Sequence, residues 1–81
     1  LTEERRKQIV KVAHDSAEQA RNSIRQIRRD GNETLRKMEK AKEISEDQMH
    51  DGIESVQKLT DAYVGKIGDS VEAKEKEIME V

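Results

Sequence analysis

Apolar and small residues recur along the chain at the three- and four-residue spacing of an α-helix. In the first half the steps between them are 4, 4, 3, 4, 3, 4, 4 and 3, at Ile9, Ala13, Ala17, Ala20, Ile24, Ile27, Gly31, Leu35 and Met38. In the second half the steps are 4, 3, 4, 3, 4 and 4, at Met49, Ile53, Val56, Thr60, Tyr63, Ile67 and Val71, and Ile78 returns to the same face. A disordered chain has no reason to keep such a phase, so both halves are predicted to be amphipathic helices.

Capping signals predict where these helices begin. Thr2 can cap the first helix, and Ser45 with Gln48 has the spacing of a capping box that starts the second. We expect one helical domain over residues 1–81, incomplete as a bundle, with a helix over about 3–41, a turn over about 42–45 and a helix over about 46–80. The predicted fold class is all-α: a long antiparallel two-helix hairpin, shaped as a rod.

The glycines argue mildly against two continuous helices, because each Gly costs a helix about 1 kcal/mol relative to Ala. The apolar stripe keeps its phase across Gly31, which predicts a close-packing point between the helices. Gly65 and Gly68 lie within one turn of each other and predict a softened stretch of the second helix.

The composition excludes most other classes of protein. Charged residues make up 42% of the 81 residues and apolar residues 32%, which is too little apolar volume for a sandwich, barrel or α/β sheet. There is no apolar run of the roughly 18 residues that a membrane span needs. The absence of Cys removes disulfides and thiolate chemistry. We therefore expect no membrane partner.

Candidate catalytic and metal-binding groups are scarce. His14 with Glu18, and Asp47 with His50, each supply at most half of a metal site, so solvent-facing imidazoles are favoured. No Ser/His/Asp arrangement can be assembled on a rod without a concave pocket. The sequence predicts no enzyme, no catalytic residue, no metal and no cofactor.

The charges are divided between the two halves. Residues 1–40 hold 11 Lys or Arg against 7 Asp or Glu, a balance of +4, and residues 41–81 hold 5 against 11, a balance of −6. A polyanion would therefore meet the first half. Five polar positions there fall within about 80° of one another, about a third of a turn from the apolar stripe: Arg21, Arg25, Arg28, Asn32 and Arg36.

This arginine face has two interpretations, and the pattern alone leaves both open. Arginine forks spaced along a straight helix suit the phosphates of folded RNA or a duplex, and the lack of interleaved aromatic rings argues against stacking on single strands. Alternatively, the face only solubilises the protein and forms ion pairs with acidic residues of the second helix. The protein would then be a structural coiled-coil or helical-bundle interaction module with no RNA contact.

Five stretches of the sequence resemble bacterial ribosome recycling factor: LTEERRKQIVK (1–11), SIRQIRRDGNETL (23–35), KEISEDQ (42–48), VQKLTDAYV (56–64) and KEKEIMEV (74–81). The resemblance covers all 81 residues but only the C-terminal part of the family's chain. It implies that these helices are two of the three in a rod-like bundle, whose first helix and accompanying β-rich domain are missing here. Without that first helix, which would lie in the groove between the two present, we expect the two helices to self-associate or to melt over a broad temperature range.

The resemblance also implies a function. Members of the family are cytoplasmic translation factors that act with elongation factor G to recycle the post-termination ribosome. Their helical domain lies along large-subunit RNA, and the matching positions here are Arg25, Arg28 and Arg29. Arg21 and Asn32 are adjacent and are included in the expected RNA-binding set. The expected partners are thus the ribosome, through its large-subunit RNA, and elongation factor G.

Overall fold

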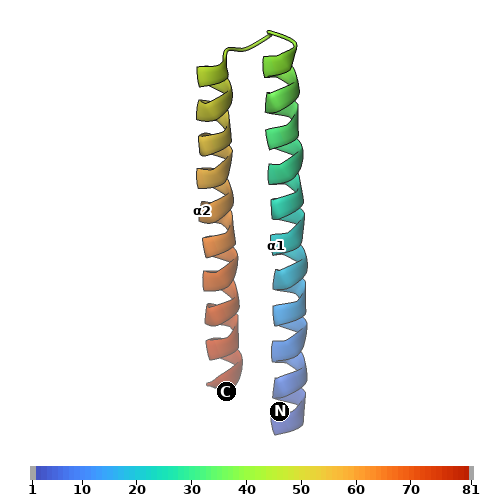
Figure 1. The fold of residues 1–81 in the computed structure, drawn as a ribbon. Coiled ribbons are helices and arrows are strands. Elements are labelled where there is room, and N and C mark those ends of the chain that lie inside the picture. The colour runs from blue at the N-terminus through green and yellow to red at the C-terminus, as the bar shows by residue number, and fades with distance from the viewer. Residues whose placement is uncertain (1, 81) are drawn as a thin grey trace.

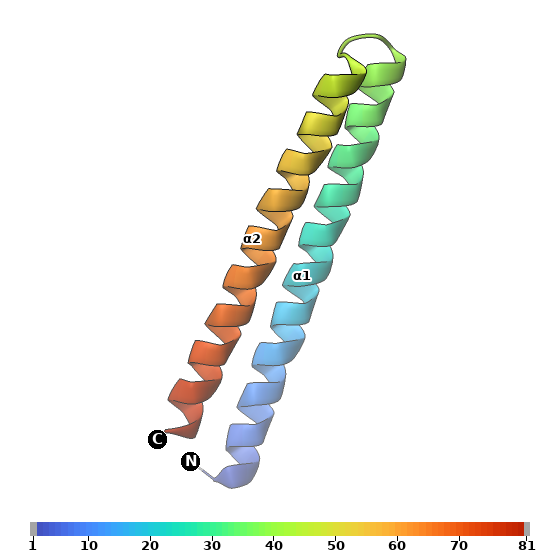
Figure 2. The ribbon, with the colours of Figure 1, turned by 60° about the vertical axis from the view of Figure 1, so that its left-hand side comes forward.

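Two long helices lie side by side and antiparallel in the computed structural model, which describes residues 2–80 (Figures 1 and 2). They are α1 (Glu3–Lys40) and α2 (Glu46–Met79). The molecule measures 60 × 15 × 9 Å along its principal axes, so it is a rod one helix thick and two helices wide. The predicted all-α, antiparallel two-helix hairpin is confirmed.

The predicted caps form at the N-terminus of each helix. The Thr2 hydroxyl accepts a hydrogen bond from the Arg5 backbone N–H at 3.1 Å. The Ser45 hydroxyl accepts from the Gln48 N–H at 3.0 Å, while the Gln48 side-chain oxygen accepts from the Ser45 N–H at 2.8 Å. The capping box is therefore reciprocal, and each cap is typically worth about 1 kcal/mol of helix stability.

The turn begins with a Schellman motif at the end of α1. The Lys42 N–H donates to the Glu39 carbonyl and the Glu43 N–H donates to the Met38 carbonyl, both at 2.9 Å. Lys42 has a φ of 63°, the left-handed conformation that glycine usually supplies at this position. The chain therefore reverses direction in the few residues between Lys40 and the capping box.

The contact between α1 and α2 is thin. Among the described residues, only Ala17, Thr60 and Ile78 are buried, and no large side chain is completely enclosed. The Thr60 hydroxyl donates to the Val56 carbonyl at 2.8 Å, which satisfies this polar group within its own helix. The remaining apolar residues of the contact are half-buried, so the core of the hairpin is a single seam that is open on both sides.

Large apolar residues are exposed outside that seam. Their exposed fractions run from 52% to 69%, at Val12, Ile27, Leu59, Tyr63 and Met79. Ile27 and Tyr63 belong to the sequence-predicted stripes, yet they lie beside the contact and not within it. An apolar stripe wider than about 100° exceeds what one neighbouring helix covers. The hairpin thus leaves part of its apolar surface without a partner.

The glycines are arranged differently from the prediction. A Cβ added at Gly31 would meet nothing within 4 Å, so the predicted close-packing point at Gly31 is wrong. The close approach is at Gly52, where an added Cβ would lie 2.9 Å from Leu35 Cδ1. Gly31 faces the open side of the seam, which its phase in the stripe could not reveal. Helix α2 continues without a break through Gly65 and Gly68.

This difference predicts that alanine stabilises the hairpin unequally at the two glycines. Gly31→Ala should stabilise the hairpin by about 1 kcal/mol, because it adds helix propensity without a clash. Gly52→Ala should gain clearly less, because Leu35 must move to admit the new methyl group. Thermal unfolding followed by circular dichroism at one protein concentration compares the two variants. Equal increases in Tm would contradict the packing difference.

Candidate nucleic-acid interface

Four of the predicted RNA-binding residues lie on one side of α1. At about 100° per residue they fall within about 60° of one another, and Ile27 lies roughly 100–160° away from them. We call this surface the arginine flank: Arg21, Arg25, Arg28 and Asn32. The fifth residue, Arg29, lies further around the helix and is exposed. The predicted residues therefore lie on the side of α1 that is turned away from Ile27.

Two arginines of the flank share an acidic partner on their own helix. Arg21 Nη1 lies 3.3 Å from Glu18 Oε2, and Arg25 Nη1 lies 3.9 Å from Glu18 Oε1. The Arg21 side chain is only 22% exposed, and its guanidinium faces Gly68 of α2, 3.9 Å from where a Cβ would stand. Arg21 is therefore less accessible to a partner than Arg25, whose side chain is 41% exposed.

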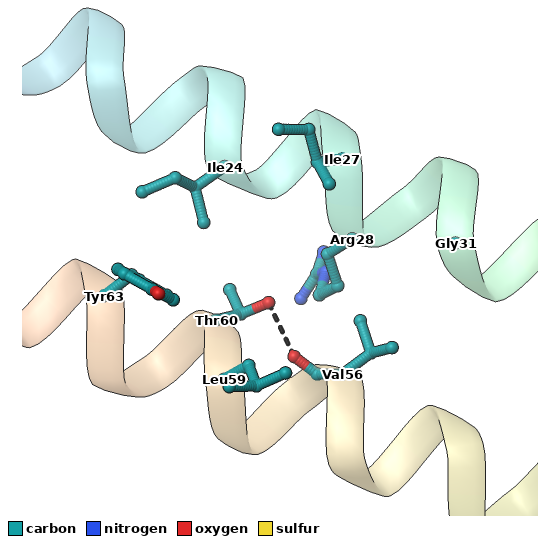
Figure 3. A pocket seen from close by; sticks show the side chains of 8 residues that line it. All are labelled: Ile24, Ile27, Arg28, Gly31, Val56, Leu59, Thr60 and Tyr63. Carbon is teal, nitrogen blue, oxygen red and sulfur yellow. Dashed lines mark hydrogen bonds between the residues drawn. The ribbon is translucent and has the colours of Figure 1, made fainter.

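Arg28 reaches from α1 toward α2 (Figure 3). Its Nη1 donates to Gln57 Oε1 of α2 at 3.3 Å. Its Nε and the Asn32 Oδ1 are both buried without a hydrogen-bond partner. The sequence places the whole arginine face a third of a turn from the apolar stripe. In the structure Arg28 lies closer to α2, because it is only about 40° around α1 from Ile24 at the centre of the contact.

Acidic residues of α2 do not pair with these arginines in the part of the chain that the structure describes. The ion pairs of Arg21 and Arg25 go to Glu18 of α1, and the α2 partner of Arg28 is the neutral amide of Gln57. Exposed ion pairs of this kind contribute about 0–1 kcal/mol and are readily exchanged for a stronger ligand. The interpretation in which α2 acids neutralise the flank is therefore not supported.

The two histidines have other neighbours than their sequence spacing suggests. His14 Nε2 lies 3.3 Å from Glu75 Oε2 of α2, and not against Glu18, while His50 Nε2 lies 3.7 Å from Glu46 Oε1 of its own helix. Both imidazoles are about half exposed or more, at 51% and 63%. Within residues 2–80 there is no cluster of three or more His, Asp or Glu side chains that could hold a metal ion.

Next to Arg28, the contact between the helices opens into an apolar groove. Its first part has a volume of about 420 Å³ and lies beside the Arg28 stem (Figure 3), lined otherwise by Ile24, Ile27, Gly31, Val56, Leu59, Thr60 and Tyr63. Beyond Tyr63 lies the second part of the groove. It has a volume of about 470 Å³ and is lined by small residues of α1 that include Ala13 and Ala20. Lys66 stands at its edge, with Nζ 5.3 Å from the centre of the Tyr63 ring. An elongated apolar partner would fit here. Neither helix has a stretch apolar enough to cross a membrane.

Two amphipathic helices that pack along one apolar seam define a helical hairpin of the bundle class. The family model described as ribosome recycling factor matches residues 1–79. The chain belongs to the ribosome recycling factor family.

Curated relatives agree with this family over the whole chain. It is 57% identical to the ribosome-recycling factor of Halothermothrix orenii, 56% identical to that of Bacillus pumilus and 54% identical to that of Bacillus subtilis. Each of these alignments covers all 81 residues of this chain and 44% of the relative. The chain therefore spans less than half the length of the relatives that it matches.

Proposed function

We propose that this chain is the RNA-binding helical part of a cytoplasmic ribosome recycling factor. In this role it binds large-subunit ribosomal RNA and, with elongation factor G, promotes recycling of post-termination ribosomes. The observation that supports the proposal most strongly is the family match over residues 1–79, together with arginines on α1 that no acid of α2 neutralises in the described residues. The proposed role is one of binding, without catalysis.

The proposed RNA contact uses Arg25, Arg28 and Arg29. A guanidinium donates several hydrogen bonds in a fixed fork and keeps its charge at any physiological pH, which suits phosphate oxygens. Arg25 and Arg28 follow each other at nearly one helical turn, and Arg29 widens the cationic surface toward solvent. Such a surface reads the shape and backbone of folded RNA and not the identity of its bases. Arg21 and Asn32 border this surface and contribute less, because the Arg21 side chain is only 22% exposed and is paired with Glu18, and Asn32 carries no charge.

The groove has its own part in the proposal. We infer that an amphipathic helix from the longer parent chain covers it and completes a three-helix rod, since this chain spans 44% of its relatives. Of the three arginines in the proposed RNA contact only Arg28 lines the groove, so the third helix would leave Arg25 and Arg29 accessible. Helix packing and RNA binding would then use neighbouring surfaces that meet at Arg28.

A charge reversal separates this function from that of a purely structural helical module. Arg28→Glu should weaken binding to ribosomes or structured ribosomal RNA by at least about tenfold, because it removes one phosphate contact and adds a repulsive charge. Lys58→Glu is the matched control: Lys58 lies on α2, is 76% exposed and pairs with Glu54 at 3.4 Å. Equilibrium binding is measured at fixed salt, with helicity checked by circular dichroism.

Equal effects of the two reversals would show that the arginine flank is not the RNA-binding surface. Binding that is indifferent to both, with helicity unchanged, would favour the structural module.

A further inference from the structure

We infer that Gln57 of α2, held by Asp61, is a positioning residue for Arg28 in the RNA contact. This inference rests on the function proposed above and adds a role for the second helix, to which the sequence assigns no RNA-binding residue. The relevant geometry is a short chain of two hydrogen bonds that runs along α2 and ends on the guanidinium of α1.

The two hydrogen bonds fix the orientation of the Gln57 amide. Gln57 Nε2 donates to Asp61 Oδ1 at 2.9 Å, and Gln57 Oε1 accepts from Arg28 Nη1 at 3.3 Å. An ionised carboxylate only accepts hydrogen bonds, so the amide nitrogen must face Asp61 and the amide oxygen must face Arg28. A flipped amide would lose both bonds and place its NH₂ group against the guanidinium. Asp61 therefore determines which end of Gln57 meets the arginine.

A neutral partner has an effect on Arg28 that a carboxylate would not have. Glu18 shares the charge of Arg21 and Arg25, whereas Gln57 holds Arg28 without neutralising it. The fork of Arg28 has five N–H donors, of which Gln57 occupies one on Nη1. The guanidinium is thus held in place with its full charge and with further donors to offer to phosphate oxygens.

Holding the side chain before the partner arrives lowers the entropy lost on binding, since a long arginine otherwise has many rotamers to give up. The Arg28 Nε is already buried against the hairpin, so the stem of the side chain is confined as well. Arg29 has no such support and stays exposed on the outer side of α1. Of the two adjacent arginines, Arg28 is the preorganised one.

A double-mutant cycle tests this role, with the chain held folded by a peptide that has the sequence of the first helix of a longer relative. Gln57→Leu should weaken binding to large-subunit ribosomal RNA about three- to tenfold, the loss that corresponds to one hydrogen bond of ordinary strength. In an Arg28→Ala background the same change should have no further effect. The matched control is Gln26→Leu, which removes an equivalent pair four residues apart, Gln26 Nε2 to Asp30 Oδ1 at 3.0 Å, with no arginine attached. It should leave the affinity unchanged.

A second variant keeps the test independent of any loss of helix. Gln57→Glu has the same shape as the parent side chain, but its carboxylate would pair with Arg28 and repel Asp61. It should weaken binding and lower the slope of log affinity against log salt, because the charge of Arg28 is then partly neutralised before RNA binds. A higher affinity or an unchanged slope would contradict positioning by a neutral partner.

The outcomes separate the two proposals. An affinity that is unchanged by Arg28→Ala would overturn the RNA-binding function and this inference with it. If Arg28→Ala weakens binding while Gln57→Leu has no effect, or the same effect in both backgrounds, only the positioning role is overturned. The positioning role is supported if Gln57→Leu weakens binding only where Arg28 is present, while Gln26→Leu leaves the affinity unchanged and both variants have the same helicity.

Discussion

At low micromolar concentration the 81-residue chain alone should self-associate or unfold over a broad temperature range, and it should not behave as a stable monomer. Only Ala17, Thr60 and Ile78 are buried among the described residues, and the largest apolar side chains stand beside the seam. A core this thin does not offset the conformational entropy lost when two helices of 38 and 34 residues become ordered. Helices of this kind gain most of their stability from packing.

Supplying the missing partner should reverse this behaviour. A peptide with the sequence of the first helix of a longer relative should raise the helicity of the chain and sharpen its thermal transition, because the peptide covers the apolar groove. Sedimentation and circular dichroism over a range of concentrations measure both effects. A variant with Ile27→Glu and Leu59→Glu is the control, since two charges in the groove should abolish the effect of the peptide.

One result would contradict the prediction directly. A monomer that unfolds in a steep transition, at a temperature independent of protein concentration, would show that the seam alone is a sufficient core.

Replacing Arg25, Arg28 and Arg29 together by Ala should nearly remove the salt dependence that α1 contributes to RNA binding. Each phosphate contact adds about 0.7–0.9 to the slope of log affinity against log salt, so the slope should fall by about 2–3. Binding should weaken most at low salt, where counterion release contributes most to the affinity. The measurement is a titration of large-subunit RNA at several salt concentrations.

The chain offers a control with the same loss of charge. Three lysines are each paired with an acid four residues away and have side chains that are 74–77% exposed: Lys11, Lys37 and Lys58. Their joint replacement by Ala lowers the net charge by the same amount. If the lysine variant flattens the slope as much as the arginine variant, the affinity comes from net charge and not from the arginine surface.

The hairpin could be predicted from the sequence because its signals are local. The apolar phase identifies two helices, and Ser45 with Gln48 marks the start of the second, where the structure has a reciprocal capping box. The roles of the glycines could not be predicted in the same way. Whether Gly31 or Gly52 meets the other helix depends on how far one helix is rotated against the other, and only Gly52 meets Leu35.

The candidate interface was predictable only in part, for the same physical reason. Spacing along one helix collects the arginines on one side, because it needs only the rotation of about 100° per residue. The partner of an individual side chain depends on the register between helices. That register brings Gln57 to Arg28 and Glu75 to His14, pairs separated by 29 and 61 residues in the sequence. The spacing of Gln57 and Asp61 signals a pair within α2 but gives no sign of Arg28.

The shape of the hairpin has a mechanical consequence. The start of α1 and the end of α2 lie at the same end of a rod 60 Å long, and the turn lies at the other end (Figure 1). When the rod rotates about the end opposite the turn, the displacement grows with distance along the rod and is largest at the turn. The hairpin then acts as a lever. The arginine flank lies partway along this lever. If it rests on RNA there, the contact becomes the fulcrum, and torque applied at one end is converted into force at the other.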